Sequence, residues 1–173
     1  MDSNKQIERR EPISPLTRAD VERLLDRIES PAELDLSLQN LEEIDLSYID
    51  LHGANLRGAN LQGANLRGIN LNAADLQAAD LSYADLDGAD LSHADLGDNE
   101  ANRVHLHRAR LSHATLRGLD LRGFDLTGLD LRNADLNETN LWDARLRGCD
   151  LQGADLSTAI LRGPELRDAR LHN

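Results

Sequence analysis

Leucine recurs at every fifth residue from Leu36 to Leu171, and 27 of these 28 positions are leucine. The residue two before it is alanine at 15 of the 28 positions, so each repeat carries two apolar positions separated by a polar one. An α-helix repeats its buried face every 3.6 residues and a strand every 2. A period of five therefore predicts a chain that turns a corner once in each repeat, which is a solenoid.

The remaining three positions of the repeat are polar or glycine. The residue directly before the leucine is Asp or Asn at 20 positions, and the residue directly after it is mostly Arg, Ser, Gln or Asn, so both are expected to face solvent. The position two after the leucine holds 11 of the 12 glycines. Glycine adopts the positive φ that a tight corner requires. The repeat is therefore A(D/N)LxG, and four replacements of its inward alanine are interpreted as adjustments of the core: Leu119, Phe124, Leu129 and Cys149.

Residues 54–68, ANLRGANLQGANLRG, show this repeat three times in succession. The pattern resembles that of the pentapeptide-repeat proteins, and the likeness covers about residues 34–173. It implies an all-β solenoid, a right-handed four-sided parallel β-helix with four repeats in each coil of 20 residues. The repeats then form about seven coils, and residues 20 apart become vertical neighbours about 4.8 Å apart.

This spacing predicts which outward residues lie above one another. One expected column contains Asp85, His105 and Asp125, with the histidine between two acids. A second contains Asp90, Arg110 and Asp130. Opposite charges stacked in this way stabilise a sheet by about 0.2 to 1 kcal/mol per pair.

Residues 16–33 are expected to form an N-terminal helix and cap, after a flexible segment over residues 1–15 and before the β-helix of residues 34–173. Thr17 and Asp20 have the spacing of a capping box, and Leu16 can pack on Val21. Apolar residues follow at helical spacing until Ser30 and Pro31. This short α-helix either covers the open first coil, as caps of repeat proteins do, or docks a partner.

The C-terminal end differs, because the repeats continue to Leu171 with no helical pattern after them. Either Pro164, which cannot donate a hydrogen bond, blunts the last strands, or two copies stack end to end. Trp142 and Ile160 occupy normally polar outward positions on the same side of neighbouring coils. They favour a homodimer through this end.

One segment, residues 97–103, departs from the repeat, with Asn99 and Ala101 at the two inward positions. The phase of five continues unchanged after it. A projecting loop usually adds residues that break this count, so a local bulge is favoured over a loop.

Composition restricts the class of protein. Aromatic residues make up only 2% of the chain, so the interior is expected to consist of leucine and alanine. No apolar run has the length of a membrane span or a signal peptide, which predicts a soluble, cytoplasmic protein with no membrane association. The single cysteine, Cys149, excludes an internal disulfide.

Charge adds a candidate surface. The formal net charge is −12, and residues 36–100 carry 12 acidic and 2 basic residues. Direct nucleic-acid binding is therefore not expected. The outward position is acidic five times in succession, and these residues are the first interaction candidates: Asp75, Asp80, Asp85, Asp90 and Asp95. Trp142 and Ile160 are the second. A structural alternative is that short polar side chains suit the position next to a turn.

No catalytic or metal constellation emerges. His93 and His113, which are 20 apart, are expected to stack, but zinc needs further ligands that their neighbours do not supply. The exposed serines have no pocket that would activate them, and a packed leucine interior leaves no cavity. The sequence thus predicts a non-enzymatic interaction or scaffold protein of unknown partner, without cofactor. The resemblance implies one alternative, because some members of that family act on DNA gyrase and are proposed to mimic DNA.

Overall fold

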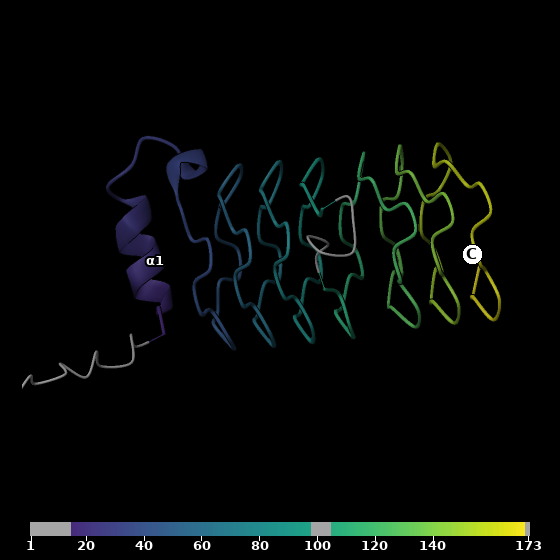
Figure 1. The fold of residues 1–173 in the computed structure, drawn as a ribbon, viewed down its shortest axis with the longest axis horizontal. Coiled ribbons are helices and arrows are strands. Elements are labelled where there is room, and N and C mark those ends of the chain that lie inside the picture. The colour runs from purple at the N-terminus through teal and green to yellow at the C-terminus, as the bar shows by residue number, and fades with distance from the viewer. Residues whose placement is uncertain (1–14, 98–104, 172–173) are drawn as a thin grey trace, which may run out of the picture.

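A computed structural model describes residues 15–97 and 105–171 of the 173-residue chain. The chain forms a straight rod of stacked rectangular coils with helix α1 at one end (Figure 1). The expected flexible N-terminal segment lies outside the described residues except for its last residue, Pro15. The described part contains no helix that is both long and apolar enough to cross a membrane.

The coils are held together by parallel bridges, each formed by one residue of either coil. Among the described residues, no strand is longer than one residue. From the first coil up to Asp95, every bridge joins residues 20 apart, such as Asp35 to Asn55. One coil therefore has four sides of five residues, as expected for a right-handed four-sided parallel β-helix. We number the sides by the first coil: side 1 begins with Asp35, side 2 with Asn40, side 3 with Asp45 and side 4 with Asp50.

Side 3 shows the whole length of the solenoid. Its bridged residues follow one another through seven coils: Asp45, Asn65, Asp85, Arg110, Asp130, Asp150 and Arg170. The step from Asp85 to Arg110 spans 25 residues, as do the steps from Asp80 to His105 and from Asp90 to Thr115. The prediction of about seven coils is confirmed, whereas the expected spacing of 20 fails at one coil.

The extra five residues lie between Asp95 on side 1 and His105 on side 2. The conformation of residues 98–104, and with it the choice between loop and bulge, lies outside the described residues. The pairing on either side nevertheless shows why the unbroken phase was misleading. An insertion of one whole repeat leaves the leucines in phase and shifts every later column by five residues.

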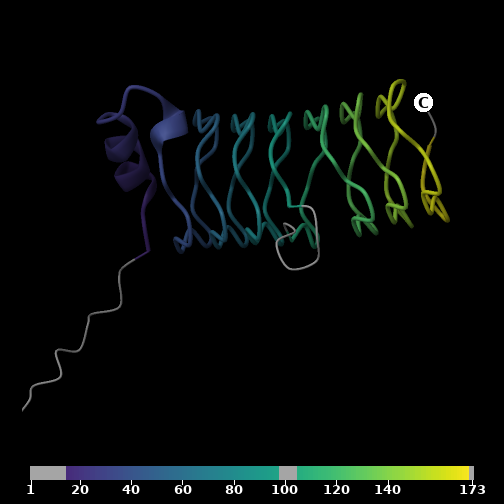
Figure 2. The same ribbon diagram turned by 45° about the horizontal axis from the view of Figure 1, so that its top comes forward.

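Most corners are tight turns in which the inward residue donates to the carbonyl of the preceding leucine, as Ala54 does to Leu51 at 3.1 Å. The third residue of the turn has positive φ, whether it is glycine, such as Gly53 at 68°, or another residue, such as Ala78 at 58°. Between coils, the leucine amide donates to the residue 19 positions later, as Leu56 does to Asp75 at 2.8 Å. Figure 2 shows the corners stacking along the rod.

The core is a ladder of leucines and small residues, most of them fully buried. The four interpreted core replacements are buried as predicted, with Phe124 only 2% exposed. Ten leucines of the coils around the 25-residue step enclose a void of about 10 Å³, so the prediction of an interior without any cavity was wrong. The void is smaller than any ligand.

Helix α1 spans Arg18–Leu25 and covers the first coil. Thr17 and Asp20 form the predicted capping box, and Val21 is completely buried against the leucine ladder. The helix ends before the predicted Ser30, because the amides after Asp26 bond three residues back instead of four and close the helix into a turn. A short 3₁₀ helix, η1, follows over Pro31–Glu33.

The opposite end is open among the described residues. Leu161 and Leu171 belong to the inward ladder, yet 47% and 51% of their surface is exposed. The amide of Leu156 makes no backbone hydrogen bond to any residue of the described chain. The last coil thus presents both apolar side chains and unpaired backbone groups.

Candidate interaction surfaces on the rod

The Asp and Asn residues of the repeat stabilise the turn that follows them through a local hydrogen bond. Their Oδ1 atoms accept the amide of the residue two positions later, as in Ser82 to Asp80 at 2.9 Å and Gln62 to Asn60 at 3.1 Å. This bond orients the residue that enters the corner. Asp and Asn perform the task equally well, so the acidic charge is not needed for the turn.

The five acidic candidates surround the rod instead of forming a stripe. Asp75 and Asp95 lie on side 1, where they bridge each other, and the other three lie on sides 2, 3 and 4 in turn: Asp80, Asp85 and Asp90. Asp95 is exposed and the other four are half-buried. Each accepts the amide two residues later, so one oxygen of every carboxylate is already engaged.

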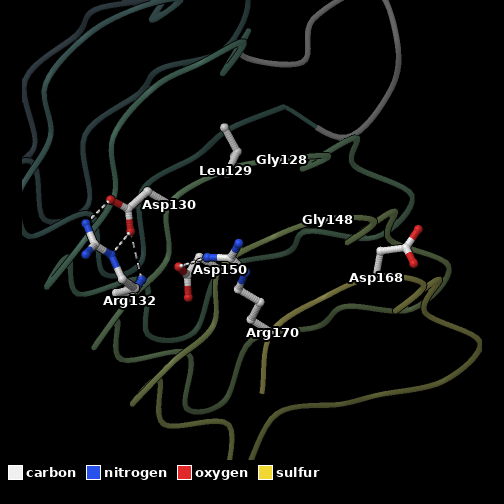
Figure 3. Close-up of a pocket in the computed structure, with 8 residues that line it drawn as sticks. All are labelled: Gly128, Leu129, Asp130, Arg132, Gly148, Asp150, Asp168 and Arg170. Carbon is white, nitrogen blue, oxygen red and sulfur yellow. Dashed lines mark hydrogen bonds and ion pairs between the residues drawn. The ribbon is translucent and has the colours of Figure 1, made fainter. Parts of the chain in front are cut away.

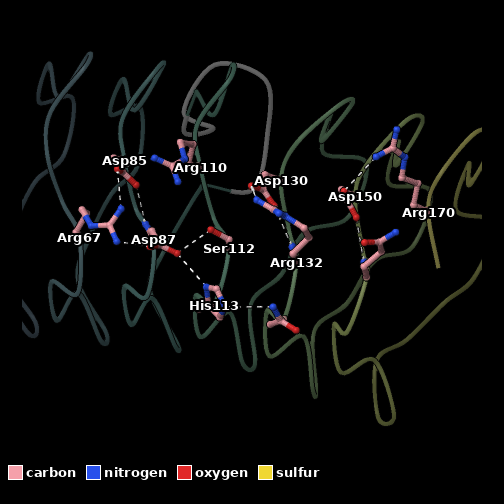
Figure 4. Close-up of polar contacts among 12 residues, drawn as sticks. Arg67, Asp85, Asp87, Arg110, Ser112, His113, Asp130, Arg132, Asp150 and Arg170 are labelled. Atoms are coloured by element: carbon pink, nitrogen blue, oxygen red, sulfur yellow. Dashed lines mark hydrogen bonds and ion pairs between the residues drawn. The ribbon is translucent and has the colours of Figure 1, made fainter. Parts of the chain in front are cut away.

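Side 3 carries a network of ion pairs that crosses the 25-residue step (Figure 4). Arg67 contacts Asp85 at 3.2 Å and Asp87 at 2.5 Å, and Arg110 of the next coil reaches Asp85 at 3.0 Å. Asp87 also accepts the hydroxyl of Ser112 at 2.7 Å. This hydroxyl, His113 and Arg67 together hold the pKa of the Asp87 carboxyl below its usual value.

The predicted columns were wrong where they cross from Asp95 to His105, because the inserted five residues shift them, whereas the predicted neighbours Arg110 and Asp130 are confirmed. Asp80 and not Asp85 bridges His105, and Arg110 lies between Asp85 and Asp130 and not below Asp90. An arginine between two acids is therefore present, although in a different column from the expected one.

The predicted stack of histidines is also absent. The His93 ring lies against Gly118, 25 residues later, where a Cβ atom would come within 2.7 Å of it. His113 lies on another side, with Nδ1 3.0 Å from Asp87 and Nε2 3.1 Å from the amide of Asn133. In residues 15–97 and 105–171, no group of three or more metal-ligating side chains converges.

A hollow of about 480 Å³ opens at the corner between sides 2 and 3 (Figure 3). Gly128 and Gly148 form part of its wall, and a Cβ atom added to either would have no neighbour within 4 Å. Two of its three carboxylates pair with arginines that also line it, since Arg132 binds Asp130 at 2.6 Å and Arg170 binds Asp150 at 3.5 Å, whereas the third, Asp168, contacts Arg147 at 3.8 Å outside it. The Arg132 pair lowers the pKa of Asp130.

Trp142 and Ile160 lie together on side 1 near the open end. Ile160 bridges Asn140, and Trp142 follows two residues after that bridge. Their exposed fractions are 45% and 52%, where the repeat normally places polar groups. The guanidinium of Arg162 lies 5.4 Å from the centre of the indole ring, in the coil next to Trp142. Trp142 and Ile160 face sideways from the rod, so they flank its end and do not form it.

Several of these partners were not identified from the sequence. Arg162 follows Trp142 by 20 residues, so the column rule could have found this pair. The spacing of 20 could also have found the pair of Arg67 and Asp87. Ser112 meets Asp87 only because the register shifts between them, and no sequence signal distinguished a bulge from one inserted repeat.

Comparisons with known proteins agree with the repeat pattern. HetL, a pentapeptide repeat protein involved in heterocyst differentiation regulation from the cyanobacterium Nostoc sp. strain PCC 7120, is 37% identical over 79% of this chain and 69% of its own, with a TM-score of 0.40. Rfr23 from the cyanobacterium Cyanothece 51142 is 23% identical over 87% of this chain and 99% of its own, with a TM-score of 0.49. A trypsin-treated form of QnrB1, a plasmid-mediated fluoroquinolone resistance protein, is 19% identical over 78% of each chain, with a TM-score of 0.37.

No curated protein sequence matches the chain. The family model for pentapeptide repeats matches with 8 copies, over residues 35–72, 69–98, 105–143, 125–163 and 139–173. These matches span both parts of the solenoid, before and after the shifted coil. The chain is a member of the pentapeptide repeat family.

Proposed function

We propose that this protein is a non-enzymatic interaction module that presents binding surfaces on the sides of a rigid rod. One observation carries the proposal: Trp142 and Ile160, exposed side by side on side 1, occupy positions that are polar elsewhere. Tryptophan is enriched among the residues that dominate binding energy at protein interfaces. The side surfaces are the accessible part of the molecule, because the interior void is too small for a substrate.

The carboxylates discussed above are engaged in contacts within the rod. The carboxylates of the acidic ring accept turn amides, and those of the hollow pair with arginines. A catalytic site instead needs polarised groups that converge on a space for a substrate. A cytoplasmic location remains part of the proposal.

The experiment is affinity capture from an extract of the source cells, with the intact protein as bait. Trp142→Ser and Ile160→Asn are expected to lose the captured protein, while Gln152→Ala, an exposed change on side 3, keeps it. Capture that both side 1 variants retain would place binding elsewhere and refute the assignment of this surface.

The open last coil supports a second element of the proposal, a homodimer. Leu161 and Leu171 expose apolar surface, and the Leu156 amide has no backbone partner within the described residues. Helix α1 covers the other end, so copies can join only tail to tail, which closes a twofold dimer and prevents a filament. Light scattering is expected to show a dimer that Leu161→Arg converts to a monomer. A monomer at high micromolar concentration would exclude it.

The alternative, a DNA-mimicking modulator of DNA gyrase, rests on the acidic ring. It is less well supported, because the five carboxylates point away from the rod on four different sides and each has one oxygen engaged in a turn. A mimic would bind gyrase in a salt-dependent way that Asp→Asn changes in the ring abolish. The interaction module is expected to keep its partner after these changes.

A further inference from the structure

Two arginines in the second half of the rod differ from the others. From Arg108 to Arg170, every described arginine except two forms an ion pair with a carboxylate. The exceptions are Arg108 and Arg162, and both lie on an exposed aromatic ring. Arg108 is 6.0 Å from the centre of the Tyr83 ring, and Arg162 is 5.4 Å from that of Trp142.

Packing on a ring orients a guanidinium without neutralising it. The attraction to the ring uses none of the N–H donors in an ion pair, so they remain available to a carboxylate. Arg162 therefore differs from Arg122 on the same side, which pairs with Asp120 at 2.6 Å. The nearby Asp143 lies over Gly163, and it forms no ion pair with Arg162 among the described contacts.

Ile160 adds an apolar surface at a structural cost. The bridge position normally holds Asp or Asn, whose oxygen accepts the amide two residues later, and isoleucine has no such oxygen. The same corner also lacks the usual turn bond, because Pro164 stands where other repeats have an N–H donor. A corner that lacks both of these hydrogen bonds and exposes an isoleucine points to selection for binding.

We infer that the surface formed by Trp142, Ile160 and Arg162 binds an acidic, apolar peptide segment of a partner protein. An apolar side chain of the partner covers the indole ring and Ile160, and a neighbouring carboxylate pairs with Arg162. The inference rests on the proposed interaction function and specifies its partner. Charge complementarity selects this occupant, since Arg162 is a cation beside the apolar pair and forms no ion pair with a carboxylate of residues 15–97 or 105–171.

The chain provides its own probe, because Trp142 is its single tryptophan. Intrinsic fluorescence of the full-length protein is titrated with three short peptides of alternating residues, Glu-Leu, Gln-Leu and Lys-Leu. The Glu-Leu peptide is expected to shift the emission to shorter wavelength at the lowest concentration, and the Lys-Leu peptide at the highest. Arg162→Gln should weaken binding of the Glu-Leu peptide about fivefold and remove its advantage over Gln-Leu.

Two matched variants separate the contributions. Arg167→Gln removes an exposed arginine from side 2 and should leave all three titrations unchanged. Ile160→Asn restores the missing turn acceptor, so it should fold, and it should weaken all three peptides alike. Far-ultraviolet circular dichroism verifies the fold of each variant.

Three results would overturn the inference. These are equal affinity for the three peptides, preference for Lys-Leu, or an emission shift on concentrating the Leu161→Arg variant alone, which would make a second copy the occupant of the side 1 surface. If affinity capture depends on Trp142 while the peptides show no acidic preference, the interaction function stands and only the class of partner is wrong. If capture also ignores Trp142, the interaction surface itself is refuted.

Discussion

The corners allow a quantitative test of how the rod is stabilised, through alanine substitution of two glycines with the same φ. Gly88 has φ of 70°, and a Cβ atom placed on it would have no neighbour within 4 Å. Gly53 has φ of 68°, but its Cβ would lie 2.8 Å from the Cβ and 3.3 Å from the Cα of Ala32 in η1. The pair therefore separates the backbone cost of a corner from the packing cost.

The left-handed conformation costs a non-glycine residue about 1 to 2 kcal/mol. Alanine recovers about 0.5 to 1 kcal/mol, because it loses less chain entropy than glycine on folding. Gly88→Ala should therefore destabilise the protein by about 0.5 to 1 kcal/mol. Gly53→Ala adds a clash with backbone that cannot rotate away, worth about 1 to 3 kcal/mol, and should cost about 2 to 4 kcal/mol in total.

Urea unfolding followed by circular dichroism measures both changes in the free energy of unfolding. The slope of the transition is compared between variants, because a repeat protein can lose cooperativity. A third variant, Ala78→Gly at φ of 58°, should stabilise the rod by about the amount that Gly88→Ala costs. A neutral or stabilising Gly88→Ala would refute the backbone argument. Equal losses at Gly53 and Gly88 would show that η1 does not pack tightly on the first coil.

Four further predictions follow from the same structure. Asp80→Ala should lower the free energy of unfolding by about 1 kcal/mol and Asp80→Asn should hardly change it, because only alanine removes the acceptor of the Ser82 amide. Chemical denaturation measures both variants, and equal losses would show that the charge of Asp80 matters. Thr17→Ala should cost about 1 kcal/mol and release α1 first, which native-state hydrogen exchange at Val21 would detect. Hydrogen bonds from Ser157 and Asn137 lower the pKa of Asp155 to about 2. The contribution of this carboxylate to stability is therefore complete above its unfolded pKa of 3.8 and is lost as the pH falls through 2. The midpoint temperature of thermal unfolding should fall over this pH interval, and a rise would contradict the argument. Deletion of Asn99 to Arg103 should preserve the fold, because it leaves four residues between Asp95 and His105 and so restores the spacing of five between successive sides; loss of the circular dichroism spectrum would contradict it.

The inward half of the repeat could be predicted almost completely from the sequence. A leucine every five residues has only one way to remain buried once the chain turns at every repeat, so the core, including Phe124 and Cys149, followed from position alone. The capping box was equally predictable, because Thr17 and Asp20 interact within one turn of the chain. Contacts of this kind depend on local spacing, which the sequence states directly.

Contacts between coils could not be predicted with the same certainty, because they depend on the total number of residues in each coil. Asp85 meets Arg110 because one coil has 25 residues. Ala101 marks the place of the addition in the sequence, but the phase of five is the same before and after it and does not reveal that a repeat was added. The hydrophobic period reports the length of a side, whereas the number of sides in each coil is set by the path of the chain. A repeat inserted whole is therefore invisible to any argument from phase.

The same reasoning bears on where a binding surface can be identified in this protein. Trp142, Ile160 and Arg162 all follow the 25-residue step, and they are joined by a spacing of 20 or less. Their adjacency is therefore independent of the inserted repeat, unlike the contact between Asp87 and His113, which the inserted repeat creates. A repeat added or removed at this corner would rearrange the ion pairs of side 3 and leave the side 1 surface intact. Binding at side 1 that survives the deletion of Asn99 to Arg103 would show that the surface is an independent unit of the rod.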